Sequence, residues 1–258
     1  MRVATWNVNS VTARLPRLLA WLESAKPDVV CLQELKCATE AFPPEVRDLG
    51  FEVAAYGLGR WNGVAVLSRV GLEDVRRGLV DEPTYDDAAE PRAVGATCGG
   101  VRVWSVYVPN GREPGHPHYA YKLRWLEALR ATAVAESAPE RPFAVLGDFN
   151  IAPADDDVWD ISLFTESTHV TEPERAALAA LREAGLRDVV PRALKYDKPY
   201  TYWDYRQLAF PNNHGMRIDL VYANASFADA VNDAYVDREA RKGKGPSDHA
   251  PVVVDLTL

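Results

Sequence analysis

The sequence predicts an α/β fold in which two β-sheets pack face to face and helices cover their outer sides. Short apolar runs that end in polar or turn residues are typical of buried strands, and segments with apolar residues at helical spacing lie between them. This strand–helix–strand order occurs in both halves of the chain, with no Gly/Ser-rich linker between them. The chain of 258 residues is long enough for one large domain, so residues 1–258 are expected to form a single domain.

The first half of the chain alternates apolar strand patterns with one clear helix. Leu15, Leu18 and Leu22 recur at helical spacing, which predicts an amphipathic helix over residues 14–25, and Pro27 marks its end. The acidic, Pro-bounded segment 81–92 has no periodicity and is predicted to be a loop. Strands are expected over residues 2–7, 28–34, 51–56, 63–67, 94–97 and 101–108.

The second half contains the longest helical pattern, over residues 119–136, where Leu123, Leu126 and Leu129 share one face. A further helix is predicted over 174–184, because Gly185 supplies a stop signal. Residues 151–170 are polar and acidic and are predicted to form a connection. Strands are expected over 143–148, 218–222 and 251–256.

Composition narrows the class of protein. The net charge of −8 argues against a protein that coats nucleic acid through bulk positive charge, although it allows an enzyme with a local basic footprint. The three cysteines, Cys31, Cys37 and Cys98, lack CxxC spacing and are expected to be reduced thiols in a cytoplasmic protein. The sequence shows no signal-peptide pattern and no apolar run of membrane-spanning length, so no membrane association is expected.

The segment 143–150, Phe-Ala-Val-Leu-Gly-Asp-Phe-Asn, suggests a reaction centre. Residues at i and i+2 on an extended backbone share a face, so Asp148 and Asn150 are expected to leave the strand pointing at one spot. Asp can ligate a cation or hold a proton, and Asn can donate to an anionic oxygen, a pairing that suits phosphate chemistry. An ordinary strand-to-turn exit would explain these two residues equally well.

Other expected strand ends carry similar polar residues: Asn7, Glu34, Asp219 and the pair Asp248-His249. A single acid at a strand end is usually a cap or a turn residue, but the set as a whole lies where sheets deliver side chains to a common rim. No HExxH, GxSxG, Walker A or zinc-type motif is present, which removes zincins, α/β-hydrolases and P-loop enzymes. The remaining histidines lie in polar loops and are expected to be solvated: His116, His118, His169 and His214.

Eight segments match one family, in the family's order: residues 4–10, 32–37, 62–68, 107–110, 146–153, 200–205, 216–219 and 247–251. On these residues the chain resembles exodeoxyribonuclease III and the related abasic-site endonucleases of the endonuclease/exonuclease/phosphatase superfamily, nearly end to end. The resemblance implies a four-layer α/β sandwich of two mixed β-sheets flanked by helices, as in DNase I-like folds, and a Mg²⁺-dependent phosphodiesterase in which Mn²⁺ can substitute.

The resemblance also implies a metal site. Glu34 would be the principal carboxylate ligand, with Asn7 beside it to orient ligands or phosphate. Asp248 would complete the acidic cluster and could serve a second metal position. The full set of implied metal-site residues is Asn7, Glu34, Asp148, Asn150, Asp248 and His249.

The implied catalytic roles follow the same matches. Asp148 would activate the attacking water, and Asn150 would hold the phosphoryl oxygen as charge develops. His249 would contact the scissile phosphate, oriented by Asp219 through its other ring nitrogen. Tyr107 would place its phenol near the phosphate.

DNA contacts are expected from cations and aromatic residues in the matching segments. Arg112 lies in a loop that resembles a DNA-gripping loop of the family, and a basic run over 238–244 precedes Asp248, although a solvated charged turn explains that run equally well. Four residues are expected to wall an apolar pocket that admits a sugar without a base and excludes a normal nucleotide, with a plain core role as the alternative for Trp203. The predicted DNA contacts are Arg112, Tyr121, Lys122, Tyr202, Trp203, Arg206, Met216, Ile218, Arg241 and Lys244; the pocket residues are Tyr202, Trp203, Met216 and Ile218.

Taken with the resemblance, the sequence predicts a monomeric base excision repair nuclease for double-stranded DNA. It would cleave on the 5′ side of abasic sites and trim 3′ ends as a 3′→5′ exonuclease. One alternative is a superfamily phosphatase or phosphodiesterase that acts on a non-DNA phosphoester. The other is a catalytically silent DNA-binding module, which the intact catalytic positions disfavour.

Overall fold

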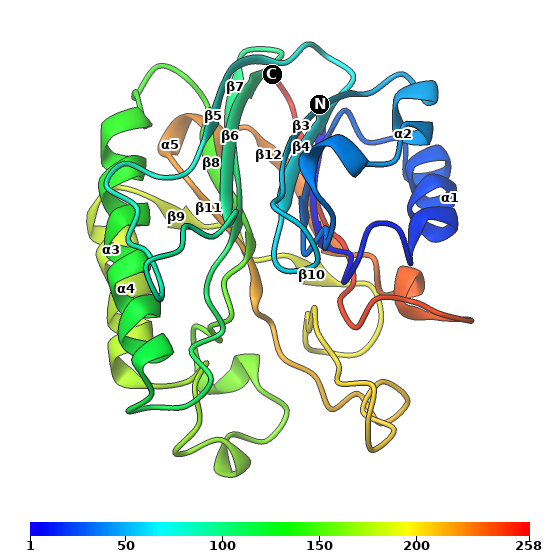
Figure 1. Ribbon diagram of the computed structural model, residues 1–258. Helices are drawn as coiled ribbons and strands as arrows, with labels where there is room; N and C mark the ends of the chain where they lie inside the picture. The colour runs from blue at the N-terminus through cyan, green and yellow to red at the C-terminus, as the bar shows by residue number, and fades with distance from the viewer.

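The computed structural model describes residues 1–258 and consists of two β-sheets packed face to face between outer helices (Figure 1), which confirms the four-layer sandwich. The first sheet has the strand order β10-β12-β13-β1-β2-β4-β3. Its strands are β1 (Arg2–Asn7), β2 (Val29–Gln33), β3 (Glu52–Tyr56), β4 (Val64–Ser68), β10 (Arg192–Ala193), β12 (Val231–Val236) and β13 (Val252–Leu256).

The second sheet has the order β5-β6-β7-β8-β11-β9. Both sheets are mixed, because β1 runs parallel to β2 and β7 parallel to β8, whereas most other neighbours are antiparallel. The strands of the second sheet are β5 (Glu73–Arg77), β6 (Ala93–Cys98), β7 (Val101–Tyr107), β8 (Phe143–Asp148), β9 (Arg187–Asp188) and β11 (Asp219–Ala223).

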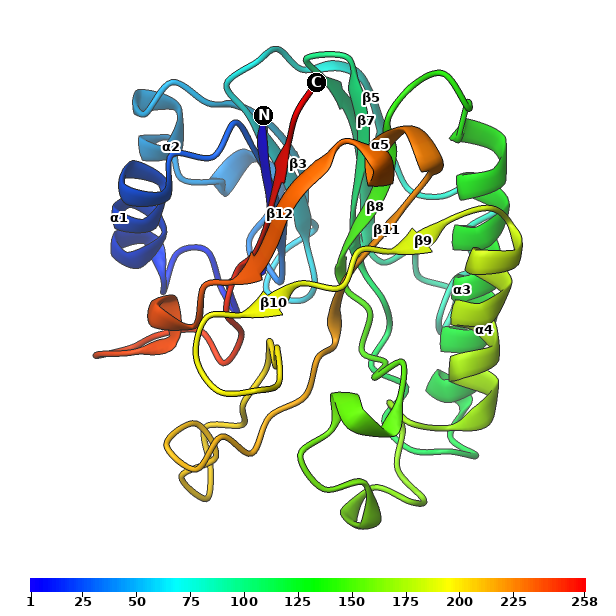
Figure 2. The same ribbon diagram turned by 180° about the vertical axis from the view of Figure 1, so that it is seen from behind.

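Helices cover the outer faces of both sheets. The helix α1 (Leu15–Ala25) lies on the outer side of the first sheet, and α3 (Pro117–Glu136) and α4 (Glu172–Glu183) run side by side on the outer side of the second (Figure 2). None of the helices combines the length and the apolar composition needed to cross a membrane. The shorter helices are α2 (Glu45–Asp48) and α5 (Ala225–Asp229), and the 3₁₀ turns are η1 (Thr39–Ala41), η2 (Asp155–Asp157), η3 (Ile161–Leu163) and η4 (Arg238–Arg241).

Three apolar layers hold these elements together. Val3 and Val66 of the first sheet and Leu146 of the second belong to the layer between the sheets. Trp125 on α3 packs in a second layer, between the second sheet and its helices. Leu18 on α1 packs in the third, against the first sheet. Burial of apolar surface at about 25 cal/mol per Å² makes these layers the main source of stability.

The long helices and the apolar strands were predicted close to their observed bounds. Several other elements, among them the two-residue strands β9 and β10, had no clear sequence signal, and four more show why. The edge strand β5 is exposed and charged, so it lacks the apolar alternation of a half-buried strand. The strand β12 carries a register shift between Val231 and Asp233, which interrupts its alternation. The other two, α2 and α5, are too short to show a helical period.

The strand arrangement brings distant polar residues to one rim. Tyr107 on β7 is the register partner of Asp148 on β8, and Asp148 is the partner of Asp219 on β11. In the other sheet, Asn7 ends β1 opposite Gln33 at the end of β2. The long connections between β8 and α4 and between β10 and β11 extend beyond the lower rim (Figure 1).

Candidate active site

Asn7 links the two sheets at the centre of the rim. Its Nδ2 atom donates to Glu34 Oε1 and to Asp148 Oδ2, both at 2.9 Å. Asn7 is fully buried, and its side-chain oxygen accepts from the backbone N–H of Asn9 at 2.9 Å. Both protons of the Asn7 amide are therefore used in hydrogen bonds. These bonds hold the carboxylates of Glu34 and Asp148 on either side of the amide.

Asp148 reaches this position because β8 passes very close to β7. A Cβ atom added to Gly147 would lie 1.9 Å from the carbonyl oxygen of Val106, so only glycine fits there. Burial and the carboxylates of Asp219 and Glu34 raise the pKa of Asp148 to about 7, although His249 and the Asn7 hydrogen bond act in the opposite direction. Asp148 therefore combines a fixed position with a pKa suited to accepting a proton near neutral pH.

His249 lies just before β13, between two carboxylates. Its Nδ1 atom is 2.8 Å from Asp219 Oδ2, and its Nε2 atom is 3.7 Å from Asp148 Oδ2. The indole of Trp6 donates to the His249 carbonyl at 3.1 Å and fixes the backbone there. Burial lowers the pKa of His249, but the carboxylates of Asp219 and Asp148 outweigh burial and raise it to about 10. The ring is therefore an imidazolium at neutral pH.

Glu34 follows β2 in a left-handed conformation, with φ of 53°. Such a backbone is uncommon for a non-glycine residue and occurs preferentially at functional sites. Its Oε2 atom is 2.8 Å from the Nζ atom of Lys36, which also donates to Asn9. Asn9 in turn donates to Asp248 Oδ1 at 3.1 Å. These side-chain contacts form one series, from Glu34 through Lys36 and Asn9 to Asp248. The series extends the site along the first sheet.

Asn150 does not continue the extended strand as its spacing predicted. Its φ of 51° is left-handed, and its backbone N–H donates to Asp148 Oδ1 at 2.9 Å, so a tight turn rather than a shared strand face brings the two residues together. The Asn150 amide donates to the Val108 carbonyl at 3.0 Å and accepts from Asn110 at 3.3 Å. One amide proton remains for another acceptor.

The backbone of Asn150 is held from behind by buried groups. The ammonium of Lys122 donates to the Asn150 carbonyl at 2.7 Å, and His169 Nδ1 contacts the same oxygen. Lys122 forms an ion pair with Glu174, and both side chains are completely buried. Glu174 also caps α4 through Thr171, so one ion pair connects α3, α4 and the catalytic turn.

Tyr107 is half-buried at the end of β7, and Arg92 lies 4.9 Å from the centre of its ring. Burial and the nearby carboxylate of Glu34 raise the pKa of the Tyr107 phenol well above its usual range, and Arg92 opposes this only in part. Tyr107 is therefore a neutral hydrogen-bond donor beside Glu34.

The charges at the rim fit a hard divalent cation. Four carboxylates lie there, together with the cationic side chains of Lys36 and His249. The Oδ1 atom of buried Asp219 has no hydrogen-bond partner. No three His, Cys, Asp or Glu side chains are close enough to enclose a metal by themselves. Mg²⁺ commonly takes only one or two carboxylates and completes its shell with water and phosphate oxygens, so this open donor set suits it. The four carboxylates are Glu34, Asp148, Asp219 and Asp248.

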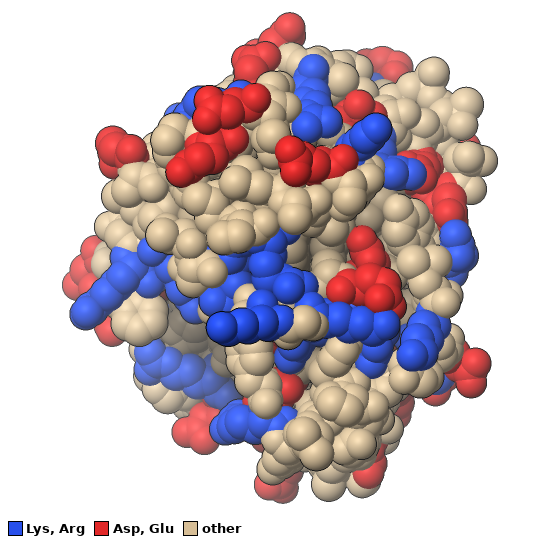
Figure 3. All heavy atoms as spheres, turned by 90° about the vertical axis from the view of Figure 1, so that its right-hand side faces the viewer, with Lys and Arg blue, Asp and Glu red and all other residues tan.

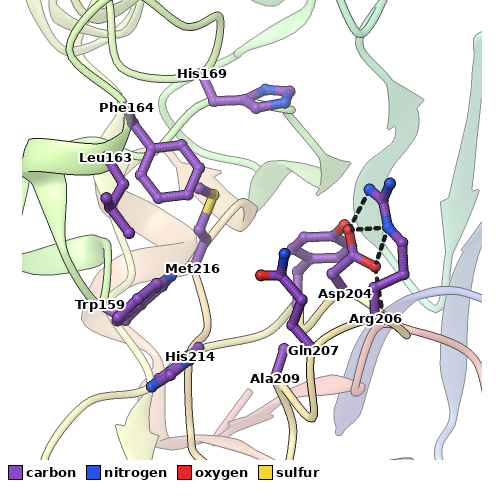
Figure 4. Close-up of a pocket in the computed structure, with 11 residues that line it drawn as sticks. Trp159, Leu163, Phe164, His169, Asp204, Arg206, Gln207, Ala209, His214 and Met216 are labelled. Atoms are coloured by element: carbon purple, nitrogen blue, oxygen red, sulfur yellow. Dashed lines mark hydrogen bonds and ion pairs between the residues drawn. The ribbon is translucent and has the colours of Figure 1, made fainter.

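A cavity of about 410 Å³ adjoins this centre (Figure 4). The predicted pocket residues Tyr202 and Met216 do line it, and the Tyr202 ring lies 4.9 Å from the His249 ring. Apart from Arg206, which was predicted to contact DNA, the rest of the lining had no sequence signal, because those side chains come from two irregular loops that meet only in the folded chain. They include Trp159, Phe164, His169, Gln207 and His214.

Three predicted DNA contacts are exposed near the rim. The Arg206 side chain is 84% exposed and pairs with Asp204, Lys244 is exposed, and Arg112 is exposed beside His116. Arg17 on α1 donates to the carbonyl of Lys242, so α1 adjoins the basic 238–244 segment. Figure 3 views the side of the molecule that carries α1 and the 238–244 segment, and it shows a band of Lys and Arg side chains there, despite the net negative charge of the chain.

Five other predicted DNA contacts are buried, and the prediction of direct contact is wrong for them. Lys122 is sealed in its ion pair with Glu174, and Arg241 is largely buried, with its guanidinium 5.0 Å from the centres of the Tyr205 and Phe210 rings. Tyr121 and Trp203 pack in the apolar layers described above, so Trp203 has the core role named as its alternative, whereas Ile218 packs with Met216 in a small cluster behind the cavity wall.

All four histidines differ from the expectation of solvated rings, because His118 is buried and His116, His169 and His214 are half-buried. His118 is 6% exposed, and burial lowers its pKa to about 4. It accepts a hydrogen bond from the Gly111 backbone at 3.1 Å and so shapes the loop that carries Arg112. His169 is half-buried at one end of the cavity, where it contacts Asn150.

Comparison with known proteins agrees with this geometry. Residues 4–249 match the model of the Endonuclease/Exonuclease/phosphatase family, whose members generally depend on a divalent cation. The chain is 31% identical to exodeoxyribonuclease III of Haemophilus influenzae, over 98% of both chains.

Solved structures share the whole fold. A Neisseria 3′ phosphatase, solved with a product DNA hairpin, is 36% identical, with full coverage of both chains and a TM-score of 0.94. An AP endonuclease from Archaeoglobus fulgidus is 32% identical, also with full coverage, and has a TM-score of 0.92. With its two-sheet architecture, its His–Asp pair and its carboxylate rim, the chain belongs to the endonuclease/exonuclease/phosphatase family, in its exodeoxyribonuclease III and AP endonuclease branch.

Proposed function

We propose that this protein is a Mg²⁺-dependent DNA repair nuclease that hydrolyses phosphodiesters of duplex DNA, on the 5′ side of abasic sites and at 3′ ends. The observation that carries the proposal is the Asn7 bridge between Glu34 and Asp148, with the His249–Asp219 pair beside it. This arrangement places three groups around one position. Asp148 is the base, the His249 imidazolium is the cation, and Glu34 is the carboxylate suited to a metal. The relatives named for DNA substrates support DNA as the phosphodiester.

Each side chain has a distinct task in the proposed reaction. Asp148 accepts the proton of the attacking water, because its pKa of about 7 leaves a large share ionised and still basic. His249 donates through Nε2 to the phosphoryl oxygen, and Asp219 fixes its ring and its charge. Asn150 and Tyr107 supply neutral donors, so negative charge that builds on the phosphoryl oxygens meets fixed dipoles.

Glu34 would hold the metal ion, with Asn7, Asp148, Asn150, Asp248 and His249 completing the proposed surroundings. The bound cation would neutralise phosphate charge and favour loss of a proton from water. Mn²⁺ is the expected substitute, since it accepts the same carboxylate, carbonyl and water oxygens. Lys36 would move from Glu34 or share it when the cation binds.

Local cations supply the proposed grip on DNA, in which Arg112, Arg206 and Lys244 contact phosphates. Every group of the site comes from one chain, so a monomer of one domain, residues 1–258, suffices. The three cysteines are free and buried, which suits the reducing cytoplasm.

The test is turnover of a duplex with one abasic site, with Mg²⁺ and with EDTA. Incision on the 5′ side of the site or removal of 3′ nucleotides, dependent on the metal, is expected. Asp148→Asn should lower kcat by roughly 10²–10⁴-fold. A glycerophosphodiester and an inositol phosphate serve as comparison substrates. Hydrolysis of either one in preference to DNA would overturn the proposal.

A further inference from the structure

A small polar cluster, the inter-sheet bridge, lies inside the apolar layer between the two sheets. Thr5 on β1, Gln33 on β2 and Ser105 on β7 form this bridge, and all three residues are completely buried. Apolar residues adjoin them, among them Val64, the register partner of Gln33 on β4, and Val103, two residues before Ser105. Polar groups that leave water destabilise such a layer unless their hydrogen bonds are made there.

The hydrogen bonds of the inter-sheet bridge connect the first sheet to the second. The Gln33 amide donates to Ser105 Oγ and to Thr5 Oγ1, both at 3.0 Å. The Ser105 hydroxyl donates to the Leu32 carbonyl at 2.9 Å and so returns to the first sheet. The Thr5 hydroxyl donates to Gln33 Oε1 at 3.2 Å. Every polar side-chain atom of the bridge therefore has a partner.

The bridge lies directly behind the catalytic rim. Thr5 lies two residues before Asn7 on β1, so both side chains are on the same face of that strand. Ser105 lies two residues before Tyr107 on β7, with the same consequence. The bridge is therefore a second polar layer, two residues further into the molecule than the rim.

Glu34 follows this bridge without an intervening residue. Strand β2 ends at Gln33, and the backbone of Glu34 then turns into its left-handed conformation. Ser105 holds both of the preceding residues, Gln33 through its amide and Leu32 through its carbonyl. The end of β2 is thus held at a fixed distance from β7, the strand that carries Tyr107.

Stability alone does not account for these polar groups. Apolar side chains of similar shape in place of a buried polar network are often neutral or stabilising. Directional hydrogen bonds, in contrast to apolar contacts, fix the distance and the orientation of the groups that they join. The bridge is thus suited to hold two strands in one relative position.

We propose that the inter-sheet bridge positions Glu34 relative to Tyr107, so that the carboxylate of one sheet and the phenol of the other keep a fixed separation. The inference rests on the proposed nuclease function and adds positioning residues to it. All three residues of the bridge are sealed from solvent, so none touches DNA, and they act through Glu34 and Tyr107. The bridge therefore affects the rate of the chemical step rather than the affinity for DNA.

A triple variant separates positioning from stability. Thr5→Val, Gln33→Met and Ser105→Ala together replace the bridge by apolar side chains and leave none of its polar side chains without a partner. The urea midpoint of unfolding should therefore stay close to that of the wild type. We expect kcat on the abasic-site duplex to fall by about 10- to 100-fold, since a displacement of about 1 Å can cost about 10²-fold. Affinity for that duplex in Ca²⁺ should change by less than about twofold.

Variants of Ser105 alone isolate its hydroxyl. Ser105→Thr and Ser105→Val add nearly the same volume, but only Ser105→Thr keeps the donor to the Leu32 carbonyl, and any strain is common to both. Ser105→Thr should retain most of the wild-type kcat, whereas Ser105→Val should lose activity in the same direction as the triple variant. This pair decides the question if the triple variant does not fold.

Ser68→Ala is the matched control. Ser68 is also completely buried and donates to the Gly71 carbonyl at 2.6 Å, but it lies at the end of β4 opposite to the catalytic rim. Its replacement should lower the unfolding midpoint and leave kcat unchanged. Mn²⁺ binding to the DNA-free protein, measured by calorimetry, gives a readout without turnover. The triple variant should bind Mn²⁺ about 10-fold more weakly, and Ser68→Ala should bind it as the wild type does.

Three results would overturn the inference. The first is a folded triple variant with the kcat and the Mn²⁺ affinity of the wild type. The second is equal kcat for Ser105→Thr and Ser105→Val, and the third is a loss of kcat in Ser68→Ala as large as in the triple variant. Failure of the proposed function is distinct, because the wild type would then show no metal-dependent hydrolysis of the duplex, whereas Mn²⁺ binding would still depend on the bridge.

Discussion

The Nδ1 atom of His249 lies 2.8 Å from Oδ2 of Asp219, and both side chains are almost completely buried. This contact fixes the ring so that Nε2 is the nitrogen on the Asp148 side. It also supplies the first of the two carboxylates that together raise the pKa of His249 to about 10 against the opposing effect of burial. The charge of His249 at neutral pH therefore depends on a residue that need not touch the substrate.

Replacement of Asp219 by Asn keeps the shape and removes the charge. We expect kcat to fall by at least about 10²-fold, the low end of the range for proton-transfer groups, while DNA affinity changes little. The loss should grow as pH rises through neutrality, because His249 deprotonates earlier without the carboxylate. Single-turnover rates between pH 5.5 and 9 check this. Parallel pH profiles for the two proteins would contradict the role given to Asp219.

Glu34 is expected to bind the metal ion, so its replacement should change the metal requirement first. Glu34→Gln keeps the hydrogen bond to Asn7 possible but removes the charge that pairs with Lys36. We predict that the Mg²⁺ concentration for half-maximal rate rises by tenfold or more, on the order of 1.4 kcal/mol. A Mg²⁺ titration of the abasic-site reaction measures it. Asp74→Asn, an exposed acid on β5, is the control and should leave the titration unchanged.

The buried pair Lys122–Glu174 should dominate one part of the stability profile. Burial raises the pKa of Glu174, but Lys122 and two threonine hydrogen bonds outweigh it and lower the pKa from 4.5 to about 2. The corresponding stability is present above pH 4.5 and is lost as pH falls toward 2. Lys122 offsets part of this contribution, because burial lowers the pKa of its ammonium from 10.5 to about 8. Urea unfolding between pH 3 and 7 should show this loss.

The same pair can be tested by substitution at neutral pH. Lys122→Met leaves a buried carboxylate without its cation and should cost roughly 3–5 kcal/mol. Lys122→Met combined with Glu174→Gln should recover much of that loss and flatten the acid dependence, because Gln retains the α4 cap without a charge. A double variant no more stable than Lys122→Met would show that packing, rather than charge, is responsible.

DNA affinity should depend on salt through a few exposed cations. Each phosphate contact contributes about −0.9 to the slope of log K against log salt. Arg206→Ala with Lys244→Ala should therefore reduce the slope by nearly two units in Ca²⁺, as measured by fluorescence anisotropy on an abasic duplex. Arg130→Ala, on the exposed face of α3, is the control. If the control moves the slope as much as the double variant does, the DNA contacts lie elsewhere.

The sequence was sufficient for the parts of the site that lie at strand ends. The apolar run before Asp148 and the one before Glu34 marked strands whose ends share a rim, so those two acids could be located without a structure. Lys122 shows the limit of such reasoning. Its helix was predicted, but its burial depends on Glu174, which lies on another helix and is distant in sequence.

The cavity was harder to predict for a related reason. Trp159 and Gln207 sit in connections without periodicity, and only the folded chain brings them to face each other. Tyr202 and Met216 were identified because they lie in matching segments beside the catalytic strand. The sequence therefore predicted a pocket, but it did not predict the volume of that pocket or the polar residues that line it.

Asn7 and Glu34 lie at strand ends of the first sheet, and Asp148 lies at a strand end of the second. The side-chain amide of Asn7 therefore connects the two sheets. A change of core volume between the sheets would alter the separation of those carboxylates without altering any group that meets DNA. The apolar interior is thus subject to selection for turnover as well as for stability. Substitutions that repack this layer in proteins adapted to heat or cold should therefore also change kcat, although they lie away from the catalytic rim.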